Sequence, residues 1–244
     1  MMTPQVKVCG ITTVDDAQLA VELGAAYLGL NFYSGSPRFL SVERAREIAD
    51  ATGRRAVLVG VFVNAPPVEV EKIAQAVGLD LLQFHGDESP ESLAPFAGRA
   101  IKAFRGTTGE ADRFGNVQGF LFDAPSADAS SLPGGTGRAW DFASLAPLVS
   151  RLAPRPVFVA GGIGPDNVAA ALAQSGASLV DVCSRVERSP GVKDPELLRR
   201  LFEAVNGSAG DRRLSGDLKS AADQLGSQAH SVFLEADEPR TYRG

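Results

Sequence analysis

The feature of this chain that most constrains its fold is an alternation of short apolar segments with segments of helical spacing, repeated eight times. Strands that alternate with helices along a chain form a parallel sheet whose faces are covered by the helices. Eight repeats favour closure into a (β/α)8 TIM barrel, an α/β fold, over an open doubly wound sheet. The predicted strands are residues 6–9, 26–32, 56–63, 79–84, 100–104, 119–123, 156–160 and 179–182.

Sequence signals mark the first residues of several predicted helices. Thr13 followed by Asp16 resembles a capping box, and Ser41 stands directly before a helical run. Ser89-Pro90-Glu91 places a proline at the first position of a helix, and Pro165 does the same after the seventh strand. We therefore expect a helix to begin at each of these places.

Helix ends are marked by glycines, and one of the eight helices is weak. The glycines at positions 24, 53, 78 and 176 each follow a helical run and lead into the next strand, as left-handed helix caps do. Residues 107–117 carry few apolar side chains, so this crossover is predicted to be one turn or irregular. The eighth helix is expected at residues 195–205.

The length and the end of the alternation predict one domain followed by an extension. At 244 residues the chain has the size at which α/β barrels form a single domain. We expect the barrel to occupy residues 1–206 and a C-terminal extension to occupy residues 207–244. Apolar residues of the extension share one helical face, but its ends are rich in Gly, Ser, Asp and Arg. This composition favours a partly disordered extension over a helix docked on the barrel.

Charge and cysteine content argue against several classes of protein. The formal net charge of −5 does not indicate the basic surface with which proteins generally bind nucleic acid. Cys9 and Cys183 are far apart and outside any CxxC motif, which argues against a disulfide framework or a zinc cluster and suits a reducing compartment. Residues 1–5 do not resemble the start of a signal peptide, and no apolar run approaches the ~18 residues of a membrane span. We expect a soluble, cytoplasmic protein that binds neither nucleic acid nor membranes.

A (β/α)8 barrel carries its functional groups at the carboxyl ends of its strands. Cys9 ends the first strand and is followed by the turn-forming Gly10, so its thiol is held rigidly at the mouth, where it is suited to proton transfer. The alternative is a structural role, because free cysteine is among the most buried residue types. The other residues at strand ends are 31–38, Asn64, His85, Asp123, Gly161, Gly162 and 181–185.

Asp123 is the candidate acid of this mouth. It ends the apolar run 120–122, where burial raises the pKa of a carboxyl group unless the group is paired. A carboxyl group that is partly protonated near neutral pH can donate a proton to a leaving oxygen. The alternatives are a helix N-cap and a partner for a buried base. The loop that follows, residues 124–138, is long and glycine-rich, which predicts a lid or a binding loop.

Two loops and one arginine are candidates for binding anionic groups. Gly161 and Gly162 follow the seventh strand, where unobstructed N–H groups can face an anion, although tight packing also explains many glycines. Ser184 and Arg185 follow the eighth strand, and the loops after strands seven and eight are the usual phosphate site of this fold. Arg38 lies in a proline-stiffened loop, and its guanidinium suits a carboxylate, although most arginines are merely solvated.

Eight motifs occur along the chain in one order: Lys7-Val8-Cys9-Gly10-Ile11-Thr12, Ser36-Pro37-Arg38, Val59-Gly60-Val61-Phe62-Val63-Asn64, Gln83-Phe84-His85-Gly86, Phe122-Asp123, Gly134-Gly135-Thr136-Gly137, Ala160-Gly161-Gly162 and Pro190-Gly191-Val192-Lys193-Asp194. In this order the chain resembles the phosphoribosylanthranilate isomerase family over about residues 5–206. The resemblance implies a (β/α)8 barrel that acts in tryptophan biosynthesis. It would convert N-(5'-phosphoribosyl)anthranilate into 1-(2-carboxyphenylamino)-1-deoxyribulose 5-phosphate by an Amadori rearrangement, without a metal or organic cofactor.

The resemblance also implies a role for each candidate residue. Asp123 would be the general acid that protonates the ribose ring oxygen, and Cys9 would be the base that removes the C2' proton. Arg38 would hold the anthranilate carboxylate, and Asp181 would lie near the sugar hydroxyls. The phosphate would be surrounded by Gly161, Gly162, Ser184 and Arg185. The expected partner is a small phosphoribosyl substrate, and the oligomeric state is left open.

Two residues depart from the family's usual Asp-Val-Ser-Ser-Gly-Val-Glu: Cys183 replaces a serine and Arg185 replaces a glycine. Arg185 then adopts a positive φ, reshapes the loop, or adds a charge that strengthens phosphate binding, and the sequence does not choose among these. Because strands one and eight are neighbours in a closed barrel, Cys9 and Cys183 are predicted to lie close together.

Two other classes of protein compete with this interpretation. A different phosphosugar enzyme would share the phosphate loops but would need metal-binding histidines or a lysine and glutamate pair, and the histidines are only His85 and His230. A non-catalytic phosphoribosyl-binding protein would keep Arg38 and the glycines but lose the acid or the base. The presence of both Cys9 and Asp123 counts against it.

Overall fold

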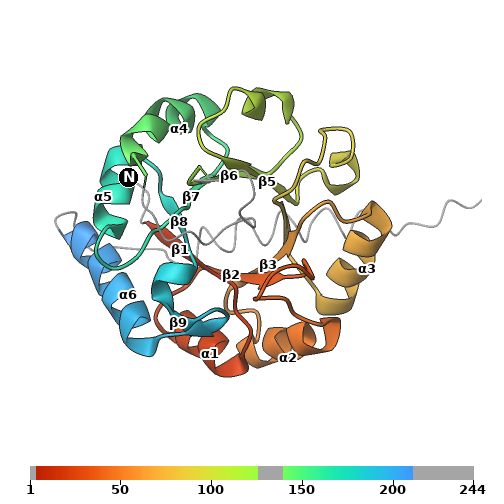
Figure 1. Ribbon diagram of the computed structural model, residues 1–244, viewed down its shortest axis with the longest axis horizontal. Coiled ribbons are helices and arrows are strands. Elements are labelled where there is room, and N and C mark those ends of the chain that lie inside the picture. Colours follow the sequence, from red (N-terminus) through yellow and green to blue (C-terminus); the bar gives the residue numbers. More distant parts are fainter. Residues whose placement is uncertain (1–3, 126–139, 211–244) are drawn as a thin grey trace, which may run out of the picture.

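The computed structural model describes residues 4–125 and 140–210, with side chains up to residue 207. Eight parallel strands close into a barrel in which each strand pairs with its neighbours in the sequence and β1 pairs with β8 (Figure 1). The predicted fold class is therefore confirmed. The strands are β1 (Gln5–Cys9), β2 (Tyr27–Asn31), β3 (Val57–Phe62), β4 (Leu81–Phe84), β5 (Ala100–Arg105), β6 (Gly119–Asp123), β7 (Val157–Val159) and β8 (Leu179–Val182).

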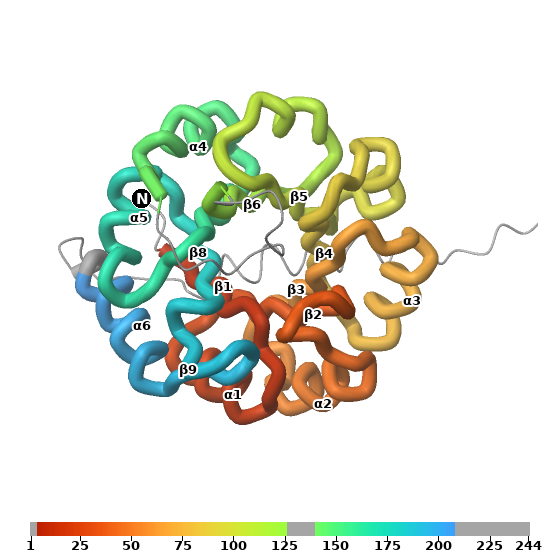
Figure 2. Tube along the Cα trace, in the orientation of Figure 1, coloured from red at the N-terminus to blue at the C-terminus, as the bar shows by residue number. Residues whose placement is uncertain are grey.

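Helices form an outer ring around the strands, as the path of the chain in Figure 2 shows. The α-helices are α1 (Val14–Glu22), α2 (Val42–Thr52), α3 (Pro67–Val77), α4 (Ala146–Leu152), α5 (Val168–Ser175) and α6 (Pro195–Gly210). Short 3-10 helices are η1 (Ala94–Phe96), η2 (Glu110–Arg113), η3 (Phe142–Leu145) and η4 (Ser184–Val186). None of the helices that the structure describes has the length and apolar character needed to cross a bilayer.

The predicted helix caps form where the sequence signals place them. The Thr13 side chain accepts a hydrogen bond from the Asp16 backbone N–H at 3.1 Å, and Ser41 accepts one from Arg44 at 3.2 Å. These bonds satisfy donors that the first turn of a helix leaves open. The four predicted cap glycines all have positive φ, which ends the helices without side-chain strain.

Two predicted helix starts are wrong. No α-helix begins at residue 90, because the segment forms turns and then η1, and Pro95 inside it removes a backbone donor and obstructs a helix. The helix after β7 begins at Val168 rather than Pro165. Here the Asn167 side chain donates to the carbonyl of Gly162 and accepts from Gly164 N–H, which holds the preceding residues in a turn.

The crossover at residues 107–117 contains only η2, in agreement with the prediction of one turn or an irregular path. The eighth helix, α6, begins at Pro195 as expected but extends to Gly210. It packs between α1 and α5 (Figure 1). The apolar face predicted in the extension lies at residues 214–229, outside the described residues, and so do residues 126–138 of the predicted lid.

The barrel interior is packed by inward side chains of alternate strand positions. One buried cluster fills it, and within this cluster the rings of Tyr27 and Phe158 meet edge to face with centroids 5.2 Å apart. Lys7 is the register partner of both Tyr27 and Asp181, so all three side chains point inward. Because side chains alternate along a strand, Cys9 points inward as well, one layer nearer the mouth. A second, larger cluster joins the strands to the helices.

A small antiparallel hairpin follows β8 and was not predicted. It consists of β9 (Glu187–Ser189) and β10 (Val192–Lys193). The carbonyl of Gly191, at its turn, accepts a hydrogen bond from the Thr12 hydroxyl. The hairpin is thereby tied to the loop after β1 and places Glu187 and Lys193 beside the barrel mouth.

Candidate active site

The two candidate proton-transfer groups are the last residues of their strands. Cys9 ends β1 and Asp123 ends β6, and both side chains point into the mouth. In the pairing of β5 with β6, Asp123 is opposite Arg105, the last residue of β5. These strand ends make a mouth with titratable groups on both sides.

Burial raises the pKa of Asp123 to about 6, against a usual value of 3.8, although a hydrogen bond from the Ala124 N–H and the charge of Arg105 oppose the shift. The Ala124 nitrogen lies 2.8 Å from Asp123 Oδ1. Oδ2 lies 3.8 Å from Nε2 of His85. Near neutral pH part of the Asp123 population therefore retains its proton, which is the form that a general acid needs.

His85 faces the site in its neutral form. Burial lowers its pKa to about 3, and the charge of Arg105 acts in the same direction. Gln83 Nε2 lies 3.4 Å from His85 Nδ1, whereas His85 Nε2 is buried without a hydrogen-bond partner among the described residues. A buried, unpaired ring nitrogen at the mouth can pair with a polar group of a ligand.

Cys9 lies in an environment that favours its thiolate. The neighbouring Cys183 side chain holds the pKa of Cys9 well below its usual value. Burial opposes this shift, while the positive charges of Lys7 and Lys193 support it. Nζ of Lys193 also donates to the Cys9 carbonyl at 2.6 Å, which fixes the backbone at the end of β1.

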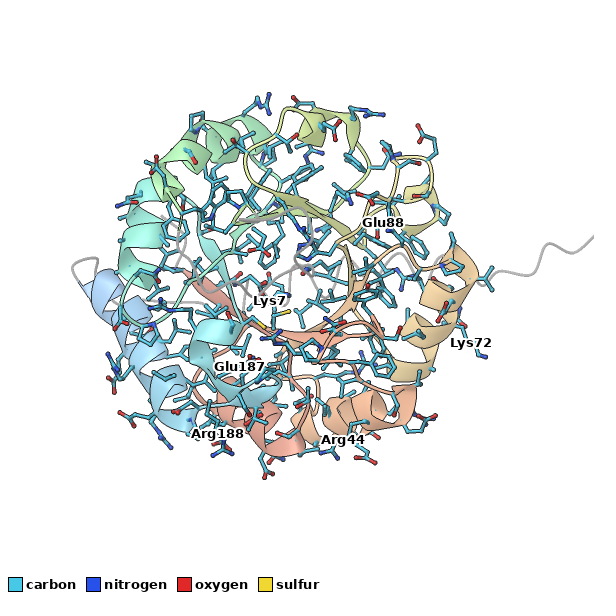
Figure 3. The ribbon with its side chains drawn as sticks, in the orientation of Figure 1. Lys7, Arg44, Lys72, Glu88, Glu187 and Arg188 are labelled. Carbon is cyan, nitrogen blue, oxygen red and sulfur yellow. The ribbon has the colours of Figure 1, made fainter. Side chains whose placement is uncertain are left out.

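Lys7 and Asp181 form an ion pair inside the barrel, below Cys9. Lys7 Nζ lies 2.8 Å from Asp181 Oδ1, and the Lys7 side chain is fully buried. Figure 3 shows Lys7 pointing into the centre of the barrel. Burial raises the pKa of Asp181 to about 7, although Lys7 opposes the shift. The predicted sugar-binding residue is thus held rigidly at the bottom of the mouth.

Arg38 is fixed in the site by the hairpin. Its Nε and Nη2 atoms donate to the two carboxylate oxygens of Glu187 at distances of 2.7–3.2 Å. Glu187 also accepts from Lys193 Nζ at 2.8 Å. Glu187 lies at the inner side of β9 (Figure 3). Arg38 is therefore an oriented guanidinium, not a solvated one, and no described residue accepts a hydrogen bond from its Nη1.

The predicted phosphate loops lie side by side because β7 pairs with β8. A Cβ built on Gly161 would lie 2.4 Å from the nitrogen of Ala124, and its φ is +92°, so only glycine can occupy this position. Close packing thus explains Gly161 fully, and its N–H still lies at the mouth. Gly162 also has a positive φ, and Ser184 begins η4 after β8.

Arg185 does not have the positive φ that was one of its expected outcomes. The non-glycine residues with positive φ among those described are Arg54 and Asn64. Arg185 lies in η4, and its guanidinium pairs with Asp166 at 3.3 Å. The replacement of glycine is therefore accommodated without strain, and its charge is partly balanced by an acidic neighbour.

Several residues of the site were not predicted. Lys7 is a lysine inside an apolar strand, a signal that points to a buried charge. Glu187 and Lys193 are brought to the mouth by the hairpin of β9 and β10, which was not predicted. Among the described residues, no group of three or more His, Cys, Asp and Glu side chains is arranged to hold a metal ion.

A cavity of about 700 Å3 adjoins the mouth over the ends of β3, β4 and β5. Its wall includes His85 and Arg105 from the mouth and Asn64, Glu88 and Lys102 beyond it. Glu88 accepts a hydrogen bond from the Asn64 backbone N–H and forms an ion pair with Lys102 at 2.7 Å. Figure 3 shows Glu88 on this side of the barrel. The cavity widens the mouth on the side away from the phosphate loops.

Comparisons with known proteins agree with this geometry. Residues 6–204 match the family model described as N-(5'phosphoribosyl)anthranilate (PRA) isomerase. The N-(5'-phosphoribosyl)anthranilate isomerase of Pseudomonas fluorescens (strain SBW25) is 40% identical over 209 residues, which cover 84% of this chain and 96% of that protein.

Solved structures give the same result. The crystal structure of phosphoribosyl anthranilate isomerase from Thermus thermophilus matches with a TM-score of 0.74 and 38% identity, over 83% of this chain and 98% of that one. A phosphoribosyl anthranilate isomerase in complex with reduced 1-(o-carboxyphenylamino)-1-deoxyribulose 5-phosphate matches with a TM-score of 0.72 and 32% identity, over 84% and 99% of the two chains. A family match over most of the chain and relatives at this level of identity lead to one conclusion: the chain belongs to the phosphoribosylanthranilate isomerase family.

Proposed function

We propose that this protein converts N-(5'-phosphoribosyl)anthranilate into 1-(2-carboxyphenylamino)-1-deoxyribulose 5-phosphate, a step of tryptophan biosynthesis, by general acid–base catalysis. The observation that carries the proposal is the pair at the mouth, in which the pKa of Asp123 is raised to about 6 and that of Cys9 is lowered. These are the directions that an acid and a base need. The related isomerase crystallised with a reduced form of the product supports the choice of substrate.

Asp123 acts in the first step. Its protonated carboxyl group donates a proton to the ribose ring oxygen, the C1'–O bond breaks, and the nitrogen lone pair of the anthranilate forms a Schiff base. Burial keeps this proton available near neutral pH. The Asp123 carboxylate that results stays close to neutral His85 and positive Arg105.

Cys9 acts in the second step. Its thiolate removes the C2' proton, and the electrons of the C–H bond move into the Schiff base to give an enolamine, which tautomerises to the ketone. Lys7 and Lys193 favour the thiolate before this transfer. Because β1 and β6 end on different sides of the mouth, the acid and the base reach the sugar from different directions.

The remaining residues bind and orient the substrate. Arg38, held by Glu187, directs its open guanidinium edge at the anthranilate carboxylate. Asp181, held by Lys7, lies near the sugar hydroxyls. Gly161, Gly162, Ser184 and Arg185 surround the phosphate, with backbone N–H groups as the main donors. Binding at both ends of the substrate leaves the ribose between Cys9 and Asp123.

Turnover of the substrate by the purified full-length protein tests the proposal. Phosphoribosylanthranilate loses its anthranilate fluorescence on isomerisation, so the signal should fall at a rate proportional to protein concentration. The product should have the same mass as the substrate, because an isomerisation neither adds nor removes atoms. Binding without any fluorescence loss would instead support the non-catalytic alternative and overturn the proposal.

A further inference from the structure

Cys9 and Cys183 are side by side at the mouth, which confirms the predicted proximity. In the pairing of β1 with β8, Lys7 is opposite Asp181 and Val8 is opposite Val182, so the next residues of the chain are Cys9, the last of β1, and Cys183, the first after β8. Each thiol is the largest influence on the pKa of the other, which requires the two side chains to lie close together. Neighbouring strands are ~4.8 Å apart, which lies within the Cα separations of ~4.4–6.8 Å that a disulfide spans.

The loop after β1 leaves room for the second thiol. Gly10 has a φ of +70°, and a Cβ at this position would lie 3.1 Å from Sγ of Cys183. Cys183 has left the strand conformation, with φ −140° and ψ −92°, so its thiol is directed by a loop rather than by the sheet. A thiol held by a loop can move the short distance that bond formation requires.

The surroundings give the two sulfurs different characters. Cys9 is only 9% exposed and lies near the positive charges of Lys7 and Lys193. Cys183 is half-buried, and its Sγ lies 3.8 Å from Oε1 of Glu187, a negative group. Cys9 is thus the sulfur that carries negative charge, and Cys183 is the protonated neighbour that can be recruited later.

We propose that Cys9 and Cys183 form a redox modification site, in which a hydroperoxide joins the two residues into a reversible disulfide. The resulting loss of activity rests on the proposed function, because it follows from the role of Cys9 as the base. The bond formation rests only on the placement of the two thiols.

The reaction is balanced with a hydroperoxide as oxidant. The Cys9 thiolate attacks one peroxide oxygen, the O–O bond breaks, and the products are a Cys9 sulfenic acid and water or an alcohol. The Cys183 sulfur then attacks the Cys9 sulfur, the S–S bond forms as the S–O bond breaks, and the hydroxyl leaves as water with the Cys183 proton. The two thiols lose two electrons, and the peroxide gains them. An external thiol reverses the bond by thiol–disulfide exchange.

The test treats the reduced full-length protein with hydrogen peroxide and then labels free thiols with a maleimide for intact-mass analysis. The wild type should acquire no label, its mass should fall by two hydrogen atoms, and dithiothreitol should restore both thiols and activity. Cys183→Ser is the matched variant, since serine keeps the size of the side chain and removes only the second sulfur. It should form no disulfide, and prolonged peroxide should oxidise its Cys9 beyond recovery.

Two results would overturn the proposal. One is a wild type that keeps two maleimide-reactive thiols after peroxide, and the other is a wild type whose activity is lost as irreversibly as that of Cys183→Ser. The activity of each protein after peroxide is compared with the activity of the same protein before oxidation. The intact mass of the wild type shows whether the disulfide forms, even if the variant fails to fold. A disulfide that forms without any loss of turnover would leave the site standing and would instead contradict the role of Cys9 under the proposed function.

Discussion

The dependence of turnover on pH follows from the burial of Asp123. With a pKa of about 6, Asp123 is protonated in about half of the molecules at pH 6, in about one in eleven at pH 7 and in about one in a hundred at pH 8. Only the protonated form can act as the acid in ring opening. We therefore expect kcat/KM to fall about fivefold between pH 6 and pH 7 and nearly tenfold between pH 7 and pH 8. The pKa of Cys9 is lowered from its usual value, which favours the thiolate over this range.

The anthranilate fluorescence assay can measure this profile between pH 5.5 and pH 8.5. The substrate phosphate also titrates near pH 6, so a control must separate its effect from that of the enzyme. Asp123→Asn provides it, because the amide does not titrate, so any decline that survives in the variant belongs to the substrate or to another group of the site such as Asp181, whose pKa is about 7. A wild-type profile that is flat from pH 6 to pH 8, or that matches the profile of Asp123→Asn, would refute the assignment of Asp123 as the acid.

Two further substitutions probe other parts of the mouth. Arg38→Lys keeps the charge but loses the paired contact with Glu187, and we expect KM to rise by about tenfold or more, as measured by steady-state kinetics; an unchanged KM would show that Arg38 does not orient the carboxylate. Lys102→Met leaves Glu88 buried without its partner and should cost about 3–5 kcal/mol of unfolding free energy in urea. Lys102→Met with Glu88→Gln should recover part of that loss, and equal stability of the single and double variants would contradict the buried pair.

Much of the fold could be predicted because its signals are local. The alternation of strands and helices, the caps at Thr13 and Ser41 and the glycines at helix ends each depend on a few neighbouring residues. The helix expected from residue 90 failed because the start signal at Ser89-Pro90 is followed by Pro95, which prevents the next turn. Near Asn167 the start was misplaced because a side chain bonds back to the glycine loop, a contact that no local pattern reveals.

The residues of the site also fall into those that the sequence predicts and those that it does not. Cys9 and Asp123 could be predicted, because a barrel places strand ends at its mouth and both residues end a strand. The groups that position them could not, because they come from opposite ends of the chain. Lys7 contacts Asp181 across 174 residues, and Lys193 reaches the carbonyl of Cys9 across 184. Such contacts appear only when β1 and β8 close the barrel and the hairpin folds over them.

The most direct test of the acid–base account is the turnover of Cys9→Ala and Asp123→Asn with phosphoribosylanthranilate, compared with Lys72→Ala as a matched control. Lys72 is exposed on α3, on the outside of the barrel (Figure 3). Both site variants should fold and bind the product but lose turnover by about 10²–10⁴-fold, because each loses a proton-transfer group and little packing. Lys72→Ala should turn over like the wild type. Near-normal turnover of either site variant would contradict the account for that residue.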